Sequence, residues 1–429
     1  MTSLVADLRF RGLIADVTDE ALLQRLDHEP LTLYAGFDPT AESLQLGNLL
    51  QLCTLRRFQL AGHRPISLAG GGTGLIGDPG GKTGERPLVT VEQLQANLEG
   101  IRPQLAQFLD FDESAGTSRA LLLDNHVWLG SIGLLEFLRD VGKHFTVNQM
   151  VAKESVKARL ERPEQGISYT EFSYMLLQAY DFLRLFEDHD CRVQLGGSDQ
   201  WGNITMGVEL VRKVRRAEVY GITTPLVTKA DGTKFGKSEA GSEDLWLDAE
   251  KTSPWRIYQF LLNTEDAVVG TYLRYFSFAS HDEIVALDEA TASRPERREA
   301  QQALAREVCA LLHGTQAADR AERAAKALFA GELASLDEAT LADVVADAPS
   351  SRLARDRLAQ GLPIVDALVE SGLVKSKSEA RTMLRQGGVY VNDQQEKDEQ
   401  RMLGAGDLLH DRYLVLRRGP RTYHVFVCG

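Results

Sequence analysis

A junction between a strand and a helix near the N-terminus places neutral hydrogen-bond donors where a negatively charged ligand can bind. Residues 31–37 (LTLYAGF) form a short apolar run, a turn follows, and apolar residues recur at helical spacing from Leu46 onward. Backbone N–H groups at the start of a helix attract anions, and Gly47 allows a nucleotide to approach the main chain closely. A capped helix with surface polar residues explains this segment equally well when it is taken alone. The polar side chains of the junction are Thr40, Gln45 and Asn48.

A glycine cluster follows the next strand-like run. Residues 65–69 are mainly apolar and lead into Gly70-Gly71-Gly72-Thr73-Gly74. Residues 72–77 match the GxGxxG pattern, but a dinucleotide site also needs a long helix directly afterwards, and the segment 78–81 (DPGG) interrupts it. A dehydrogenase is therefore disfavoured. Lys82 and Arg86 are either solvated charges or ligands for an anion.

A third segment, residues 229–238 (KADGTKFGKS), places Lys234 and Lys237 three residues apart on a glycine-containing loop after a strand. Two such ammonium groups suit a reaction whose transition state spreads negative charge over phosphoryl oxygens. The loop is modest evidence alone, and the anion-binding junction near the N-terminus strengthens it.

The order of elements predicts how these segments are positioned. A strand, a helix, a second strand and a glycine loop are typical of a βαβ unit with a parallel sheet. A further strand over 191–195 is expected to lead into Gly196-Gly197-Ser198-Asp199 and a helix over about 201–214. We expect one more strand near 224–228, and mainly helices over 90–190 and 250–345.

The last part of the chain differs from the rest. The net charge of the whole chain is −13, whereas the residues from 360 onward contain ten Lys and Arg against nine Asp and Glu. Ser376 and Glu379 form a capping-box pattern before a short helix, and strand pieces are expected at 389–393 and 413–416. A polar stretch over 352–361 suggests a connector.

Composition limits the class of protein. With 429 residues, 43% hydrophobic and 25% charged, the chain is typical of a globular protein of about three domains. No stretch approaches the roughly 18 apolar residues of a membrane span, and the N-terminus lacks the pattern of a signal peptide. The four cysteines lie far apart, which favours reduced thiols in the cytoplasm and no metal site. The acidic balance disfavours a general DNA-binding protein.

Taken together, these segments resemble class I aminoacyl-tRNA synthetases, and in detail the bacterial tyrosyl-tRNA synthetases, over essentially the whole chain. The matching segments are Tyr34–Thr40, Gly74–Pro79, Glu171–Tyr174, Leu177–Asp181 and Gly196–Asn203, together with Lys234–Ser238 as the KMSKS-type loop. The tail resembles an S4-type RNA-binding module. The resemblance implies an α/β fold with a Rossmann-like parallel-sheet catalytic domain over 1–228. It also implies a helical insertion at about 125–165, an α-helical domain over 229–345, a linker over 346–360 and an α+β S4-like domain over 361–429.

One motif departs from the family. Its usual His-x-Gly-His signature is here Gln45-Leu46-Gly47-Asn48, so both histidines are replaced by amides. Adenylate formation needs no proton transfer at phosphorus, and amide N–H groups can replace ring nitrogens as donors to the phosphates of ATP. A catalytically degenerate paralogue that acts as an RNA-binding protein is the alternative. A tryptophanyl relative is disfavoured by the tail and by the pairing of Tyr34 with Asp181.

The resemblance assigns a role to each matching residue. The chain would activate L-tyrosine with ATP and then transfer it to the 3′-terminal ribose of tRNA(Tyr), with Mg²⁺ arriving on ATP and no tightly bound cofactor. The implied tyrosine-binding residues are Tyr34 and Asp181 for the hydroxyl, and Asp78, Tyr174, Gln178 and Gln200. The implied ATP-binding residues are Gly36, Asp38, Gly47, Gly197, Asp199 and Lys237. The implied catalytic residues are Thr40, Gln45, Asn48, Lys82, Arg86, Lys234 and Lys237.

The resemblance also implies partners. Lys377, Arg381 and Arg385 recur at spacings of four, which places their charges on one helix face suited to RNA phosphates, although a solvated face has the same pattern. The full implied RNA-binding set is Lys375, Lys377, Arg381, Arg385, Arg417 and Arg418. A homodimer through the insertion is expected, although its apolar residues Phe137, Leu138 and Phe145 suit a core equally well.

Overall fold

The computed structural model describes residues 2–78, 90–153, 156, 157, 160, 166–233, 235, 244–330, 332–346, 348–419 and 422–429. Two compact units divide the chain. The first consists of residues 1–251 and 264–304, and the second consists of residues 252–263 and 305–429. Helix α14 (Glu299–His313) contains one of the boundaries.

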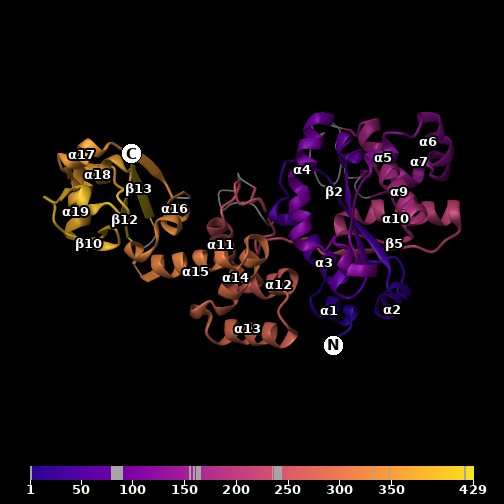
Figure 1. Cartoon of the computed structure of the whole chain (residues 1–429), viewed down its shortest axis with the longest axis horizontal. Coiled ribbons are helices and arrows are strands. Elements are labelled where there is room, and N and C mark those ends of the chain that lie inside the picture. Colours follow the sequence, from indigo (N-terminus) through magenta and orange to yellow (C-terminus); the bar gives the residue numbers. More distant parts are fainter. Residues whose placement is uncertain are drawn as a thin grey trace. The chain divides into compact units, whose positions relative to one another are not determined.

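A six-stranded sheet forms the centre of the first unit (Figure 1). Five of its strands are parallel and the short β1 lies antiparallel at the edge. In spatial order the strands are β1 (Asp16–Val17), β6 (Tyr220–Thr224), β5 (Cys191–Gly197), β2 (Thr32–Phe37), β3 (Arg64–Ala69) and β4 (Leu121–Asp124). Because parallel strands need crossover connections, helices separate β2, β3 and β5 along the chain.

Helices cover the sheet of the first unit. Helix α3 (Leu49–Leu60) packs against β3 and β5, and α9 (Tyr169–His189) and α10 (Trp201–Arg215) pack on each other and on β5. The core contains residues of the strands and of α9 and α10. Among the described residues, the other helices of this unit are α1 (Leu4–Phe10), α2 (Ala21–His28), α4 (Val91–Phe108), α5 (His126–Leu129), α6 (Leu134–Asp140), α7 (Val147–Val151), α12 (Asp266–Phe276) and α13 (His281–Ser293).

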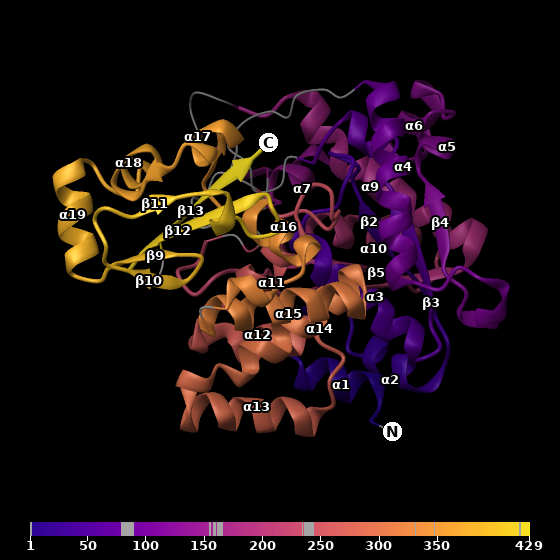
Figure 2. The same ribbon diagram turned by 60° about the vertical axis from the view of Figure 1, so that its left-hand side comes forward.

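The second unit combines helices with a five-stranded sheet, β10 (Gln394–Glu396), β9 (Val389–Val391), β12 (Tyr413–Arg418), β13 (Thr422–Cys428) and β7 (Ser350–Leu353). Residues of α18 (Ile364–Glu370) and α19 (Lys377–Arg385) share one apolar core with this sheet. Figure 2 shows the two helices beside the strands. A two-stranded sheet pairs β8 (Leu362–Pro363) with β11 (Met402–Leu403). The remaining helices are α11 (Pro254–Leu262), α15 (Thr315–Ala330), α16 (Glu338–Ala346) and α17 (Arg355–Ala359).

The predicted α/β class with a parallel sheet, helical regions and a C-terminal sheet domain is confirmed. Three local predictions need correction. The strand expected near 224–228 ends at Thr224, because Pro225 has no N–H for a ladder. The stretch 90–190 is mainly helical, as predicted, but it also contains β4, whose four residues are too few to distinguish from a helix by periodicity. Within the predicted linker 346–360, β7 pairs with β13 and α17 forms, so this segment belongs to the C-terminal fold.

Candidate active site

A cavity of about 330 Å³ opens at the carboxyl ends of neighbouring strands β2, β3 and β5, where ligands bind in open parallel sheets. Glycines that end or follow these strands line it, among them Gly36, Gly70 and Gly197. Helix α9 contributes Tyr174, Gln178 and Asp181. The helix presents these three side chains together because residues three and four apart share a face.

The cavity brings together most of the predicted substrate-binding residues. The predicted residues that line it are Tyr34, Gly36, Asp38, Gly47, Asn48, Asp78, Tyr174, Gln178, Asp181, Gly197, Asp199 and Gln200. Thr40 is exposed, and neither it nor Gln45 is among the described lining residues. The four cations predicted to act on the phosphates, Lys82, Arg86, Lys234 and Lys237, lie outside the described residues.

The hydroxyl of Tyr34 lies in the wall of the cavity without a hydrogen-bond partner among the described residues, and its side chain is only 1% exposed. Asp181 is also buried, and its carboxylate accepts hydrogen bonds from Trp128 Nε1 at 2.7 Å and Asn125 Nδ2 at 2.9 Å. Burial raises the pKa of Asp181 to about 7, although these two donors oppose the shift. Burial and the nearby Asp181 raise the pKa of Tyr34 well above its usual value, so this phenol remains protonated.

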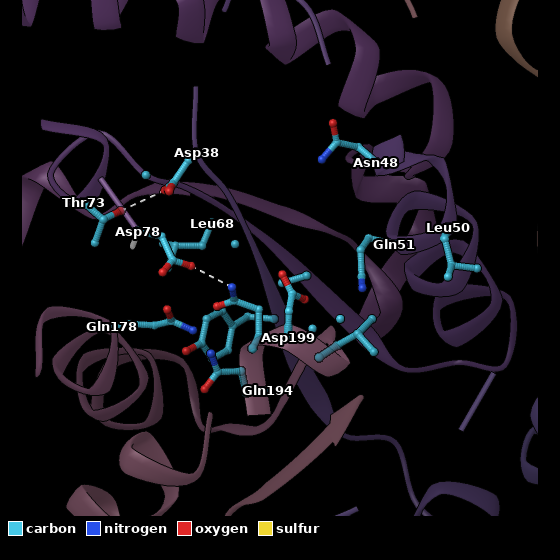
Figure 3. Close-up of a pocket in the computed structure, with 18 of the residues that line it drawn as sticks. Asp38, Asn48, Leu50, Gln51, Leu68, Thr73, Asp78, Gln178, Gln194 and Asp199 are labelled. Carbon is cyan, nitrogen blue, oxygen red and sulfur yellow. Dashed lines mark hydrogen bonds between the residues drawn. The ribbon is translucent and has the colours of Figure 1, made fainter. Parts of the chain in front are cut away.

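A second group of polar side chains surrounds Asp78. Its Oδ2 accepts a hydrogen bond from Gln200 Nε2 at 2.7 Å (dashed line in Figure 3). Asn203 Nδ2 donates to both Gln178 Oε1 at 3.0 Å and Gln200 Oε1 at 3.1 Å. Asn203 therefore orients both amides. The predicted ammonium-binding residue Tyr174 donates to Asp38 Oδ2 at 3.1 Å, and burial together with Asp38 raises its pKa well above the usual value.

The described wall of the cavity carries negative charge. It contains four carboxyl groups, those of Asp38, Asp78, Asp181 and Asp199, and no Lys or Arg among its described residues. Burial and the charge of Asp78 raise the pKa of Asp199. Such a wall favours a ligand that brings positive charge and hydroxyl donors, and a bound triphosphate needs cations from elsewhere.

The two amides that replace the family histidines differ in their surroundings. Gln45 Nε2 donates to Asp244 Oδ2 at 2.9 Å, so this donor is engaged outside the cavity. Asn48 lines the cavity, and its Oδ1 accepts from the backbone N–H of Gln45 at 3.0 Å. The amide oxygen of Asn48 therefore caps the helix start, which leaves its nitrogen as the group that can donate to a ligand (Figure 3).

Sequence reasoning missed several residues of this site. Thr73 and Asn125 line the cavity, and Trp128 donates a hydrogen bond to Asp181. The position of Asn125 in the chain could have identified it. Asn125 directly follows β4, as Asp38 directly follows β2, and neighbouring parallel strands end at the same edge of a sheet. That signal requires β4 to be recognised.

The predicted RNA-binding residues differ in exposure. Lys375, Lys377, Arg381 and Arg385 lie in or beside α19 and are exposed. Three of them pair with acids, Lys377 with Asp366 at 2.7 Å, and Arg381 and Arg385 with Glu399 at 3.8 and 3.3 Å. Arg417 has only 13% of its side chain exposed, pairs with Asp393 at 3.0 Å and stacks over Tyr390. Arg418 pairs with Glu379 and donates to the carbonyl of Leu373.

The apolar residues of the insertion divide between core and surface. Phe137 and Phe145 are buried in the core of the first unit, whereas Leu138 is exposed. Other large apolar side chains are exposed on the same segment, with Leu135 at 82%; they are Val127, Leu134, Val147 and Val151. An exposed apolar surface of this kind is typical of a protein–protein interface.

Three further observations concern the whole described part of the chain. None of its helices is long and apolar enough to cross a membrane. It contains no cluster of three or more His, Cys, Asp or Glu residues that could hold a metal ion. The four cysteines, Cys53, Cys191, Cys309 and Cys428, are all buried and unbridged.

Comparison with known families identifies the class. Residues 26–330 match the family model described as "tRNA synthetases class I (W and Y)", and residues 340–426 match the "Tyrosine--tRNA ligase SYY-like C-terminal domain". The chain therefore belongs to the class I aminoacyl-tRNA synthetases of the tryptophan and tyrosine family.

Individual relatives narrow the comparison. The chain is 55% identical to a tyrosine–tRNA ligase of Roseiflexus castenholzii over 99% of both chains. It is 50% identical to that of Geobacillus stearothermophilus over 98% of this chain and 99% of the relative. Among solved structures it resembles a C-terminally truncated mitochondrial tyrosyl-tRNA synthetase of Aspergillus nidulans, with a TM-score of 0.68 and 35% identity over 77% of this chain and 95% of that one.

Proposed function

We propose that this chain activates L-tyrosine with ATP, forming tyrosyl-adenylate and pyrophosphate, and then transfers the tyrosyl group to the 3′-terminal ribose of tRNA(Tyr). The relatives that match along the full chain are tyrosine–tRNA ligases. The observation that supports tyrosine as the substrate is the Tyr34 hydroxyl, which is buried without a described partner in the same cavity as Asp181.

The two side chains complement a phenol. Tyr34 stays protonated and can donate, and ionised Asp181 can accept. The hydroxyl of tyrosine can accept from the first and donate to the second. Phenylalanine can do neither: it would leave the Tyr34 hydroxyl unpaired and would give Asp181 no hydroxyl donor beyond Asn125 and Trp128. A buried polar group that loses its partner costs about 1–3 kcal/mol.

The other polar groups of the cavity suit the amino-acid end of the substrate. Asp78 supplies a carboxylate for the ammonium group, and Gln178, Gln200 and Tyr174 supply further oxygen atoms. The hydrogen bonds from Gln200 to Asp78, and from Asn203 to both glutamines, fix these side chains before substrate arrives. A preformed site of this kind lowers the ordering cost of binding.

In the first step an oxygen of the tyrosine carboxylate forms a bond to the α-phosphorus of ATP, and the bond from that phosphorus to pyrophosphate breaks. The protein supplies position and charge, because no proton moves at phosphorus. We assign Asn48 as a hydrogen-bond donor to the nucleotide, because it lines the cavity and its amide nitrogen can donate. Gly36, Asp38, Gly47, Gly197 and Asp199 line the same cavity and are proposed as further nucleotide contacts. Mg²⁺ enters as part of the ATP substrate. We assign the neutralisation of pyrophosphate to Lys82, Arg86, Lys234 and Lys237, and contacts with the leaving phosphates to Thr40 and Gln45.

In the second step a ribose hydroxyl of tRNA attacks the adenylate, and AMP leaves. Lys375, Lys377, Arg381 and Arg385 of the α19 region are proposed as phosphate contacts, because they are exposed. Arg418 contributes at the edge of this surface, and Arg417 supports it through its pairing with Asp393. We retain the predicted limits of the first two domains, 1–228 and 229–345, as part of this proposal, and the C-terminal domain predicted over 361–429 then also includes β7 and α17.

The exposed apolar surface of the insertion supports a homodimer. We assign Val127, Leu134, Leu135 and Leu138 to the interface with a second copy. We also propose that the protein acts in the cytoplasm, where tRNA is charged. Replacement of Leu134 and Leu135 by lysine should shift the mass in solution from a dimer to a monomer, as measured by light scattering.

The experiment that tests the function is ATP–pyrophosphate exchange with the full chain and Mg²⁺. Exchange is expected with tyrosine, and at background level with tryptophan, phenylalanine or no amino acid. Absence of exchange at saturating tyrosine would contradict the proposal and favour a degenerate paralogue, in which Gln45 and Asn48 mark the lost activity.

A further inference from the structure

A continuous line of hydrogen-bonded side chains joins Asp181 to Asp38 through two residues that the predicted roles do not include. Asn125 Nδ2 donates to Asp181 Oδ2 at 2.9 Å and to Thr73 Oγ1 at 3.0 Å. Thr73 Oγ1 then donates to Asp38 Oδ1 at 3.1 Å, the hydrogen bond drawn in Figure 3. The line therefore connects the carboxylate on the phenol side of the cavity with the carboxylate assigned to the nucleotide side.

The chemistry of the Asn125 side chain suits this place. Its Oδ1 accepts from the backbone N–H of Gly72 at 2.7 Å and of Thr73 at 3.4 Å, while its nitrogen donates twice. The side chain is 1% exposed, so each of these groups would otherwise be buried without a partner. If the Asn125 amide were rotated by 180°, its NH2 group would face the backbone N–H of Gly72 and its oxygen would face the Asp181 carboxylate. Both contacts are unfavourable, so the hydrogen bonds determine the orientation of the amide.

The glycine loop is packed too closely to take another position easily. A Cβ at Gly70 would lie 2.1 Å from Asp38 Oδ1, and one at Gly71 would lie 2.1 Å from Asp124 Oδ1. A Cβ at Gly72 would lie 2.9 Å from the Leu129 side chain. The glycines at these positions thus allow the loop to rest against the ends of β2 and β4, and the Asn125 amide supplies the acceptor that its backbone N–H groups need.

Trp128 provides a natural comparison. It lies in α5, three residues after Asn125, and its single N–H donates to Asp181 Oδ1 at 2.7 Å. The indole therefore supports Asp181 alone, whereas the Asn125 amide supports Asp181 and the loop that holds Asp38.

We propose that Asn125 is a positioning residue that couples the phenol-binding carboxylate Asp181 to the glycine loop and Asp38, so that one buried amide sets both halves of the active site. This proposal rests on the proposed activation of tyrosine. Asn125 acts by holding Asp181 and the glycine loop in place, and it does not touch the reacting atoms.

The test compares four single variants in tyrosine-dependent pyrophosphate exchange, with KM for tyrosine, KM for ATP and kcat measured separately. Trp128→Phe removes one N–H and should raise the KM for tyrosine about 10-fold, with the KM for ATP and kcat nearly unchanged. Asn125→Ala should raise the KM for tyrosine by a similar factor and also lower kcat or raise the KM for ATP about 10-fold. Thr73→Val should change kcat or the KM for ATP through Asp38 and, through Asn125, also the KM for tyrosine. Thr73→Ser keeps the hydroxyl and should restore the wild-type values.

The double variant Asn125→Ala with Thr73→Val separates coupling from two independent effects. A shared network predicts a combined decrease in kcat smaller than the product of the single decreases. Melting curves identify a variant that fails to fold. If Asn125→Ala fails to fold, Thr73→Val tests the coupling instead, because coupling requires that Thr73→Val also changes the KM for tyrosine.

Two results would overturn the proposal. The first is an Asn125→Ala variant that changes only the KM for tyrosine, as Trp128→Phe does, and the second is strict multiplicativity in the double variant. An inactive wild-type chain would instead contradict the proposed function itself, and it is recognised because the wild type and all variants then lack exchange equally.

Discussion

Charged side chains are held in opposite ways in the cavity and on α19. The carboxylate of Asp181 is buried and receives neutral donors from Asn125 and Trp128. The cations of α19, such as Arg381 and Arg385, are exposed and lie near acids such as Glu399. The first arrangement selects one hydroxyl by a few strong interactions, whereas the second suits many weak interactions with a polyanion.

The difference predicts how each region responds to change. A buried charge is weakly screened and its removal leaves partners unsatisfied, so single substitutions in the cavity should have large effects and should depend on pH. Exposed charges are screened by salt, so the α19 surface should show smaller, roughly additive effects that depend on ionic strength.

The largest effect is expected from Asp181→Asn. The substitution keeps the shape but removes the charged acceptor for the phenol, so kcat/KM for tyrosine should fall by about 10²–10³-fold. Pyrophosphate exchange at several tyrosine concentrations measures this. Asp188→Asn, an exposed position of the same helix paired with Arg184, is the matched control and should be nearly neutral. Equal decreases in both variants would contradict the role of Asp181.

Removal of charge from α19 should have the next largest effect. Replacement of Lys375, Lys377, Arg381 and Arg385 by glutamine should weaken tRNA binding about 10–100-fold. The slope of the salt dependence should also fall, by somewhat under one unit for each RNA phosphate that these side chains neutralise. Filter binding at several salt concentrations measures both quantities. Tyrosine-dependent exchange without tRNA is the internal control and should not change; a parallel decrease would refute the separation of the two regions.

A third prediction concerns pH. Burial raises the pKa of Asp181 to about 7, with the charges of Asp38 and Asp124 adding to the rise. Below pH 7 the carboxyl becomes protonated and loses its role as an anionic acceptor. The KM for tyrosine should therefore rise about 10-fold per pH unit below 7. A KM that stays constant between pH 6 and 8 would show that this carboxyl is not the acceptor, whereas tRNA binding through Lys and Arg should change little in that range.

The smallest effect is on stability. The pKa of Asp181 is higher in the folded chain than its ordinary value of 3.8, so ionisation weakens folding as pH rises from about 4 to 7. Asp181→Asn removes this ionisation, although its NH2 group would face the N–H of Asn125 or of Trp128. The free energy of unfolding of the variant relative to the wild type should therefore rise by at least about 1 kcal/mol between pH 5 and pH 8. Melting curves at the two pH values measure this change; a difference between variant and wild type that is the same at both would contradict it.

The parallel sheet can be predicted from the sequence because its strands are short apolar runs followed by a polar residue or a glycine, as after Phe37 and after Leu195. The sequence also predicts that Tyr34 and Asp181 share a site, through the family resemblance. The hydrogen bonds that hold these two side chains in place could not be predicted from the sequence. The bond from Asn125 to Asp181 and the bond from Gln45 to Asp244 each join residues far apart in the chain, and no local pattern specifies such pairs. The burial of Arg417 beside Asp393 likewise depends on strand packing rather than on charge spacing.

The most direct test of the central claim is a calorimetric titration of the full chain with tyrosine and with phenylalanine at pH 8, without ATP. If buried Tyr34 and Asp181 recognise the phenol hydroxyl, tyrosine should bind at least about 10²-fold more tightly than phenylalanine, since phenylalanine leaves the Tyr34 hydroxyl unpaired and gives Asp181 no hydroxyl donor. Equal affinities for the two amino acids would show that Tyr34 and Asp181 do not recognise the phenol hydroxyl.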